Sequence, residues 1–325
     1  MPSRRVTLSG ILIAIFALGL FIYSLQRAGF DEVQKGLRQI GWGLPAIIAI
    51  SSVRLLARTL AWRALMRTPP PLASMIGATL AGEAVGNLLP LGPLAGEPAK
   101  IGYLKGRGPV GEAAAALGLE NVFYSLTIAS VIVCGMALLV LTVALPDNLR
   151  AIATAALIAM MALVAAVIFL LLRRPVAGRS ALDHLPSWLP GSARLRAVES
   201  KAYTFYTSTK GRLGRMFAFE GLFHVFGVGE VYLVLWLLSG APPSLLHAFI
   251  LESAGRVINV VFRFVPMRVG VEEFGAEKAA GLIGLADGTG VLLGLSRKLR
   301  VLFWTAIGVA VIARRGFSLR TLSNS

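Results

Sequence analysis

The chain is poor in the residues that form disulfides and metal centres. Cys134 is the one cysteine among 325 residues, which excludes an intramolecular disulfide and any site built from several cysteines. The three histidines are scattered, and neither an HExxH motif nor a close histidine pair is present. The sequence therefore predicts no metal site and no cofactor.

Charge is also scarce. Only 15% of the residues are charged and 56% are hydrophobic, whereas a soluble domain has about 25% charged residues. This composition, with a mean hydropathy of +0.74, excludes an ordinary soluble enzyme and a disordered chain. Acidic residues are the rarer sign, since 16 Asp and Glu oppose 32 Lys and Arg. The basic residues lie mostly between apolar runs, which favours the anionic inner leaflet as a partner and argues against nucleic acid.

Apolar runs predict an all-α polytopic membrane protein, with a single membrane domain over 1–325. Arg4 and Arg5 precede the first run, which is interpreted as an uncleaved anchor with its N-terminus in the cytoplasm. The basic segment 173–215 has nine cations against two acids and is expected to be cytoplasmic. About six full spans are predicted, over residues 8–25, 42–66, 119–145, 151–172, 216–238 and 291–313.

Two further apolar segments are interrupted. Residues 72–89 break at Pro90, and the chain continues through Gly96 into an arm that is too short and too charged to span about 30 Å of hydrocarbon. Residues 244–265 break at Pro266 and pass Gly270 before a second short arm. Irregular backbone at membrane depth is tolerated only inside protein or beside water. Both segments are therefore predicted to be re-entrant hairpins that line a cavity, although the second could span.

A shift of 176 residues aligns the two broken segments. Pro90 falls on Pro266, and Glu97 falls on Glu273 seven residues later. The predicted topology makes the two units inverted copies, repeat 1 over about 42–145 and repeat 2 over about 216–313. Paired interrupted segments in two such halves indicate the midplane site of a transporter.

Five carboxylates stand out within the apolar segments. A charge at the bilayer centre costs roughly 2.5–3.5 kcal/mol, so each must face water, pair with a cation or bind a proton. Simpler structural roles remain open, namely helix capping, an ion pair between Glu252 and Arg256, or arginines reaching toward phosphates. The five acids are Glu83, Glu97, Glu120, Glu252 and Glu273, and the available cations are Arg54, Arg58, Arg256, Arg263 and Arg297.

Several stretches resemble the membrane domain of lysylphosphatidylglycerol synthases. They are SSVRLLARTLAWRALMR, GNLLPLGPLAGEPAKIGYLKGRG, LGLENVFYSL and a tail that begins RFVPMRVGVEEFGAEKAAG and ends at LFW. The resemblance covers about residues 5–315. It implies a lipid flippase, with functional positions that fall on Gly96, Glu97, Lys100, Pro266, Gly270, Glu273 and Arg297.

Two departures from the family bear on function. Many relatives have Glu-Arg where this chain has Glu120-Asn121, and the chain ends at Ser325 without a soluble aminoacyl-transferase domain. We therefore expect a non-enzymatic flippase or transporter of a phospholipid or related amphiphile. In this interpretation Arg54, Arg58 and Arg297 neutralise phosphate, while Glu97 and Glu273 hold a cationic headgroup or a proton. The alternatives are an integral-membrane transferase with a glutamate base and a scaffold for lipid-synthesis enzymes; the oligomeric state is left open.

Overall fold

The computed structural model describes residues 31, 34, 38, 40–89, 92–177, 209–263, 265 and 268–314. Within these residues the chain forms nine α-helices and no strand, as predicted. The expected anchor over 8–25, the N-terminus, Pro90, Pro266 and most of the basic segment 173–215 lie outside the described residues.

Four helices are long and apolar enough to cross a membrane. They correspond to the predicted second to fifth spans, and the segment Asp147–Phe169 is the apolar part of the fourth. They are α3 (Leu44–Ala64), α6 (Val110–Thr142), α7 (Asp147–Ala177) and α9 (Leu213–Ser239), the last preceded by a short 3-10 turn, Lys210–Arg212.

The last predicted span is present as α12 (Thr289–Arg314), which has 26 residues. It is not among the four apolar spans, because three cations lie together in its first half. These three, Arg297, Lys298 and Arg300, are buried or half-buried inside the protein.

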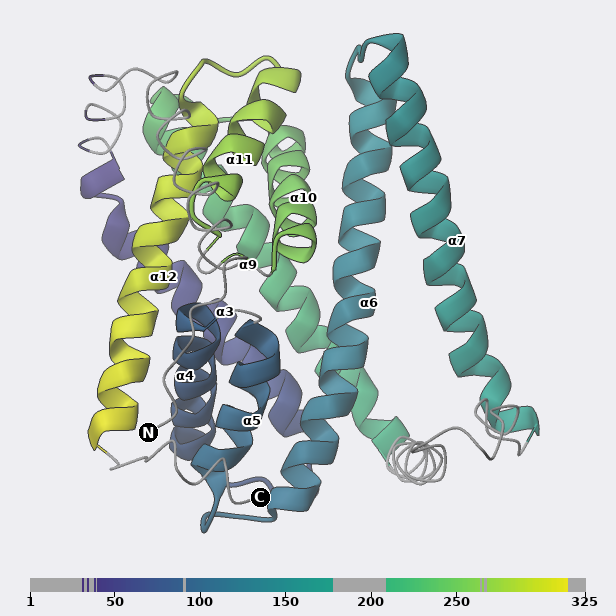
Figure 1. Cartoon of the computed structure of the whole chain (residues 1–325), viewed down its shortest axis with the longest axis vertical. Coiled ribbons are helices and arrows are strands. Elements are labelled where there is room, and N and C mark those ends of the chain that lie inside the picture. The colour runs from purple at the N-terminus through teal and green to yellow at the C-terminus, as the bar shows by residue number, and fades with distance from the viewer. Residues whose placement is uncertain are drawn as a thin grey trace, which may run out of the picture.

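Each interrupted segment folds as a helical hairpin. Every arm has 17 residues or fewer, whereas a spanning helix needs about 20. Figure 1 shows one hairpin in the lower half of the molecule and the other in the upper half, with their connecting ends turned toward each other at mid-height. The lower hairpin is α4 (Leu72–Leu88) with α5 (Gly92–Leu104), and the upper one is α10 (Leu245–Val261) with α11 (Val271–Leu282).

Glycines let the helices approach closely. A Cβ on Gly308 of α12 would lie 2.3 Å from the backbone oxygen of Leu80 in α4, and one on Gly135 of α6 would lie 2.1 Å from Oγ of Ser253 in α10. The first arm of each hairpin therefore packs on the last helix of the opposite predicted repeat. The two halves are interlocked, while α3 and α9 pack along each other between them.

The two glycines expected at the breaks have different roles. Gly270 has φ +82° directly before α11, a backbone conformation that a side chain would strain. Gly96, in contrast, lies inside the continuous helix α5 rather than at a break. A Cβ there would lie 2.7 Å from the backbone oxygen of Gly82 in α4. Its physical role is close packing within the hairpin.

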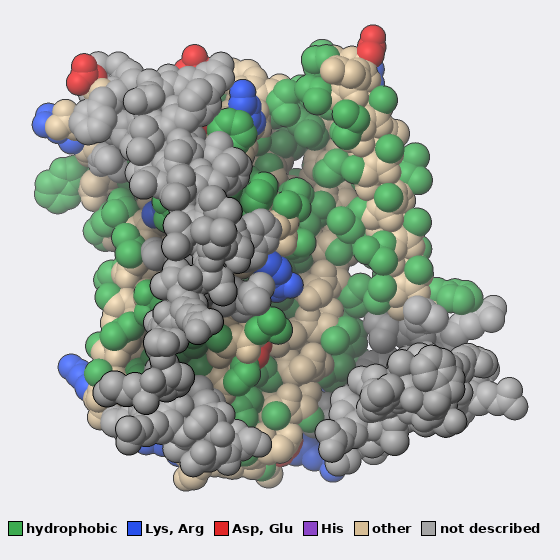
Figure 2. Space-filling view, in the orientation of Figure 1, with side chains coloured by type: hydrophobic (Ala, Val, Ile, Leu, Met, Phe, Trp, Pro, Cys, Tyr) green, Lys and Arg blue, Asp and Glu red, His purple; other side chains and the backbone are tan. Residues whose placement is uncertain are grey.

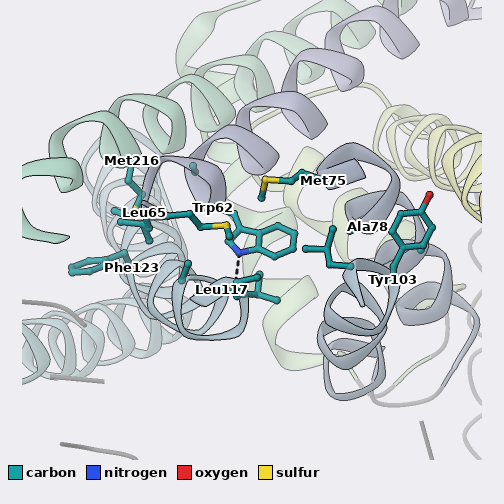
Figure 3. Close-up of a cluster of buried hydrophobic side chains, with 14 residues drawn as sticks. Trp62, Leu65, Met75, Ala78, Tyr103, Leu117, Phe123 and Met216 are labelled. Atoms are coloured by element: carbon teal, nitrogen blue, oxygen red, sulfur yellow. Dashed lines mark hydrogen bonds between the residues drawn. The ribbon is translucent and has the colours of Figure 1, made fainter. Parts of the chain in front are cut away.

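A hydrophobic cluster holds the lower hairpin against α3 and α6. Figure 3 shows Trp62 of α3 between residues of α4 and α6, with its indole Nε1 donating to the backbone oxygen of Ala113 at 2.9 Å. Met75 of α4, Tyr103 of α5 and Met216 of α9 complete the surroundings. Burial of these side chains stabilises the packing of the hairpin, because it removes apolar area from water.

Helix α7 differs from the rest because it packs chiefly on α6 and stands beside the bundle (Figure 1). None of its apolar window is buried inside the protein. Hydrophobic side chains cover its length in Figure 2, which is the surface expected of a lipid-facing span.

Candidate functional site: a buried ion network beside a polar pocket

Glu252 of α10 is the centre of a buried ion network. Its carboxylate receives Arg256 of the same helix at 2.6 Å and Arg297 of α12 at 3.1 Å. Arg54 of α3 lies 3.7 Å away. All four side chains are buried. One carboxylate therefore links α3, α10 and α12 through its ion pairs.

Glu230 of α9 extends the network toward α3. It accepts a hydrogen bond from Arg54 at 2.5 Å and lies 2.8 Å from Nε of Arg300. Arg54 therefore lies between Glu230 and Glu252 and joins the two carboxylates. The guanidinium groups of Arg54 and Arg256 also approach the ring of Phe223, at 4.8 and 4.9 Å from its centroid, a favourable arrangement when the cation is desolvated.

The start of α11 forms the third part of the network. Glu272 receives Lys298 at 2.6 Å, and Arg297 lies 3.8 Å from it. Glu273, fully buried, accepts a hydrogen bond from the backbone N–H of Gly270 at 2.7 Å and lies 3.7 Å from Lys298. Glu273 thus caps α11 and belongs to the network at the same time.

A polar pocket lies beside the lower hairpin, separate from the network. Its cavity volume is about 10 Å³, room for about one water molecule, and α3, α4, α5 and α6 contribute its walls. Arg58 pairs with Glu120 at 2.9 Å, and Lys100 pairs with Glu97 at 2.9 Å. The lining residues are Arg58, Trp62, Thr79, Glu83, Lys100, Leu117 and Glu120.

Glu83 is the exposed acid of this pocket, in contrast to the buried carboxylates of the network. Glu97 is also partly exposed, with 30% of its side chain accessible. The pocket therefore offers carboxylates that a ligand can reach, Glu83 and Glu97, whereas Lys100 is buried and paired with Glu97.

The nine residues predicted to handle substrate fall into two groups. One group lies in or next to the pocket, namely Arg58, Glu83, Glu97, Lys100 and Glu120. The other belongs to the network, namely Arg54, Glu252, Glu273 and Arg297. Arg263, considered as a possible partner, is exposed just after α10.

Several charged residues of the network were not selected from the sequence. They are Glu230, Glu272, Lys298 and Arg300. A signal for one of them was present, because Glu230 lies 176 residues after Arg54, the same shift that aligns the two broken segments. For the others, only the folded contacts distinguish a network member from a charge facing water.

These features define a polytopic α-helical membrane protein in which two short hairpins surround buried charge. The chain belongs to the family described as lysylphosphatidylglycerol synthase TM region, whose model matches residues 8–308. Membership connects it with membrane lipids, and this region of the synthases is their non-catalytic part. Searches of curated proteins and of solved structures found no match.

Proposed function

We propose that the protein is a flippase or transporter that moves a phospholipid or related amphiphile across the bacterial inner membrane. One observation carries the proposal: two hairpins too short to span enter from opposite ends with their connecting ends turned toward each other, and buried charge lies on the upper hairpin and its neighbouring helices. Interrupted helices of this kind at the bilayer midplane are typical of secondary transporters.

The packing pattern supports an inverted repeat. Exchanging α3 with α9, α4 with α10, α5 with α11 and α6 with α12 converts the packing of α4 on α12 into that of α10 on α6. The exchange also converts each hairpin into the other. Arg54 and Glu230, which are 176 residues apart, then occupy equivalent positions and contact each other, as residues near a two-fold axis do.

The charge of the connections supports a cytoplasmic lower end. Connections at that end in Figure 1 carry Arg67, Lys105 and Arg107, whereas the upper end has Arg38 before α3 and Arg150 at the start of α7. Cytoplasmic loops carry an excess of Lys and Arg. In this orientation the pocket beside the lower hairpin faces the inner leaflet.

In the proposed mechanism the pocket widens to admit a polar headgroup, while the acyl chains of the lipid stay in the bilayer. Arg58 and Lys100 attract phosphate, and Glu83 and Glu97 bind a cationic group of the headgroup. The network of Arg54, Glu252, Arg297 and Glu273 closes the path to the outer side, and rocking of one repeat against the other opens it. The residues of the network then exchange partners rather than lose them, since an unpaired buried charge is costly.

A reconstitution assay tests this function. Purified full-length protein in liposomes is expected to move fluorescent phosphatidylglycerol between leaflets faster than empty liposomes, as measured by dithionite quenching. Lys100→Gln removes a pocket cation and is expected to reduce the rate, whereas Asp147→Asn, at the exposed start of α7, is not. Translocation at the rate of empty liposomes by the wild-type protein would contradict the proposal.

A further inference from the structure

Glu220 is a buried carboxylate that the ion network does not pair. It lies on α9, it is 0% exposed, and neither of its oxygens has a hydrogen-bond donor among the described residues. An isolated carboxylate in such a place is costly when ionised, and a group of this kind becomes neutral instead. The position therefore needs a positive partner or a proton.

The neighbour of Glu220 is a second carboxylate. Glu120 of α6 is 1% exposed. One helical turn from the two acids α6 and α9 pack on each other, with ring centroids 5.2 Å apart for Phe123 and Phe217 and 5.6 Å apart for Tyr124 and Phe223. An ionised carboxylate only accepts hydrogen bonds, so two of them can share one only if a proton lies on one of the pair. A proton on one of the two acids would supply the hydrogen bond that the buried oxygens of Glu220 lack.

Neither cation that faces the pair forms an ion pair with Glu220. From α3, Arg58 pairs with Glu120 at 2.9 Å, so it balances one of the two carboxylates. From α10, Arg256 donates to Glu252 at 2.6 Å. The remaining titratable neighbours are Tyr124 of α6, 3.5 Å from Arg256, and His224 of α9, whose Nε2 lies 3.0 Å from Thr127 Oγ1.

We propose that Glu120 and Glu220 form a proton-binding site that holds one shared proton, and that a proton gradient acts on lipid transport there. The second part rests on the proposed function. Glu120 and Arg58 also line the pocket, so a phosphate that draws Arg58 away leaves Glu120 without its counter-ion. The pair, which already holds one proton, then takes up a second proton from water in the pocket. It releases this second proton when Arg58 returns. A hard metal cation fits less well, because such ions take about six oxygen ligands.

Infrared spectroscopy of the purified full-length protein tests the proton site without any transport. We expect a C=O stretching band of a buried protonated carboxyl at neutral pH, which is lost in Glu220→Gln and retained in Asp147→Asn. Should Glu220→Gln not fold, Glu120→Gln gives the same test, because Arg58 can then pair with Glu220 and ionise it. A wild-type spectrum without the band, or a band that survives both glutamate substitutions, overturns the site.

Transport under a pH gradient tests the coupling. Wild-type protein in liposomes is expected to move phosphatidylglycerol at a rate that changes with the gradient, by up to about tenfold per pH unit. Asp147→Asn is expected to respond likewise, and Glu220→Gln is not. Translocation by the wild type that ignores the proton gradient overturns the coupling, and a response to a Na⁺ gradient instead identifies the ion as Na⁺ and overturns the proton. Presence of the infrared band without any lipid movement leaves the proton site standing and rejects the proposed function.

Discussion

At the residue scale, charge inside this protein is organised around shared partners. Glu252 forms ion pairs with three guanidinium groups, and Arg54 forms ion pairs with two carboxylates. Sharing lets each desolvated ion keep several partners, which a single isolated pair at membrane depth does not provide. The arrangement also means that the loss of one group leaves several others unbalanced.

The first prediction concerns Glu252→Gln. The substitution leaves Arg54, Arg256 and Arg297 without their common carboxylate, and breaking a buried pair in this way costs about 3–5 kcal/mol. We expect a clearly lower melting temperature of the purified protein in detergent.

Glu83→Gln is the matched control, because Glu83 is exposed in the pocket. Its substitution should change stability by no more than about 0.5 kcal/mol. Equal melting temperatures for the two variants would show that the network contributes little to stability.

At the scale of elements, glycine decides how near two helices come. Gly308 brings α12 against the backbone of α4, and Gly135 brings α6 against α10. Small residues at such contacts are typical of membrane bundles, where close van der Waals packing stabilises association in place of the hydrophobic effect. The hairpins depend on these contacts, since their arms are too short to span alone.

The second prediction compares two glycines in helices. Gly308→Ala places a Cβ 2.3 Å from the backbone oxygen of Leu80, and such overpacking costs typically about 1–3 kcal/mol. Gly221→Ala adds a Cβ with no atom within 4 Å, so it should be neutral or stabilise by roughly 0.5–1 kcal/mol. Thermal unfolding of both variants measures the difference, and a stable Gly308→Ala protein would argue against close packing of α12 on α4.

At the scale of the whole molecule, the two ends differ in access. The pocket beside the lower hairpin is open and carries the exposed Glu83. Beside the upper hairpin Glu252, Glu272 and Glu273 are buried, and Ser296 on α12 is 1% exposed. If the protein transports as proposed, this arrangement is a state accessible from the side of the lower hairpin and closed on the other.

The third prediction uses this asymmetry. In a Cys134→Ala background, Glu83→Cys should react with a membrane-impermeant maleimide, whereas Ser296→Cys should react more slowly by about an order of magnitude or more, because its exposure needs an opening of the structure. Inside-out vesicles present the cytoplasmic side to the reagent. Comparable rates for both cysteines would show that the state with an enclosed Ser296 is not the one present in the membrane.

Local sequence determined the membrane class, the main helices and the two interruptions of this protein. Long apolar runs, and the prolines and glycines between them, favour or interrupt helices through residues that are close in sequence. The helices and the short hairpin arms could therefore be predicted directly. The pairing of Glu252 with Arg256 one turn away was foreseeable for the same reason. Family resemblance added the connection with lipid membranes.

Tertiary structure alone decided which charges are reachable and which are enclosed. Glu83 and Glu120 are both acids in apolar helices, yet one is open to the pocket and the other is 1% exposed beside Glu220. Gly96, expected at a break, lies within α5 and packs against Gly82 of α4, a contact that only the folded hairpin brings about. Burial and ion pairing are set by helices that are far apart in the chain, and electrostatic energy depends on those distances and on exclusion of water rather than on the order of residues.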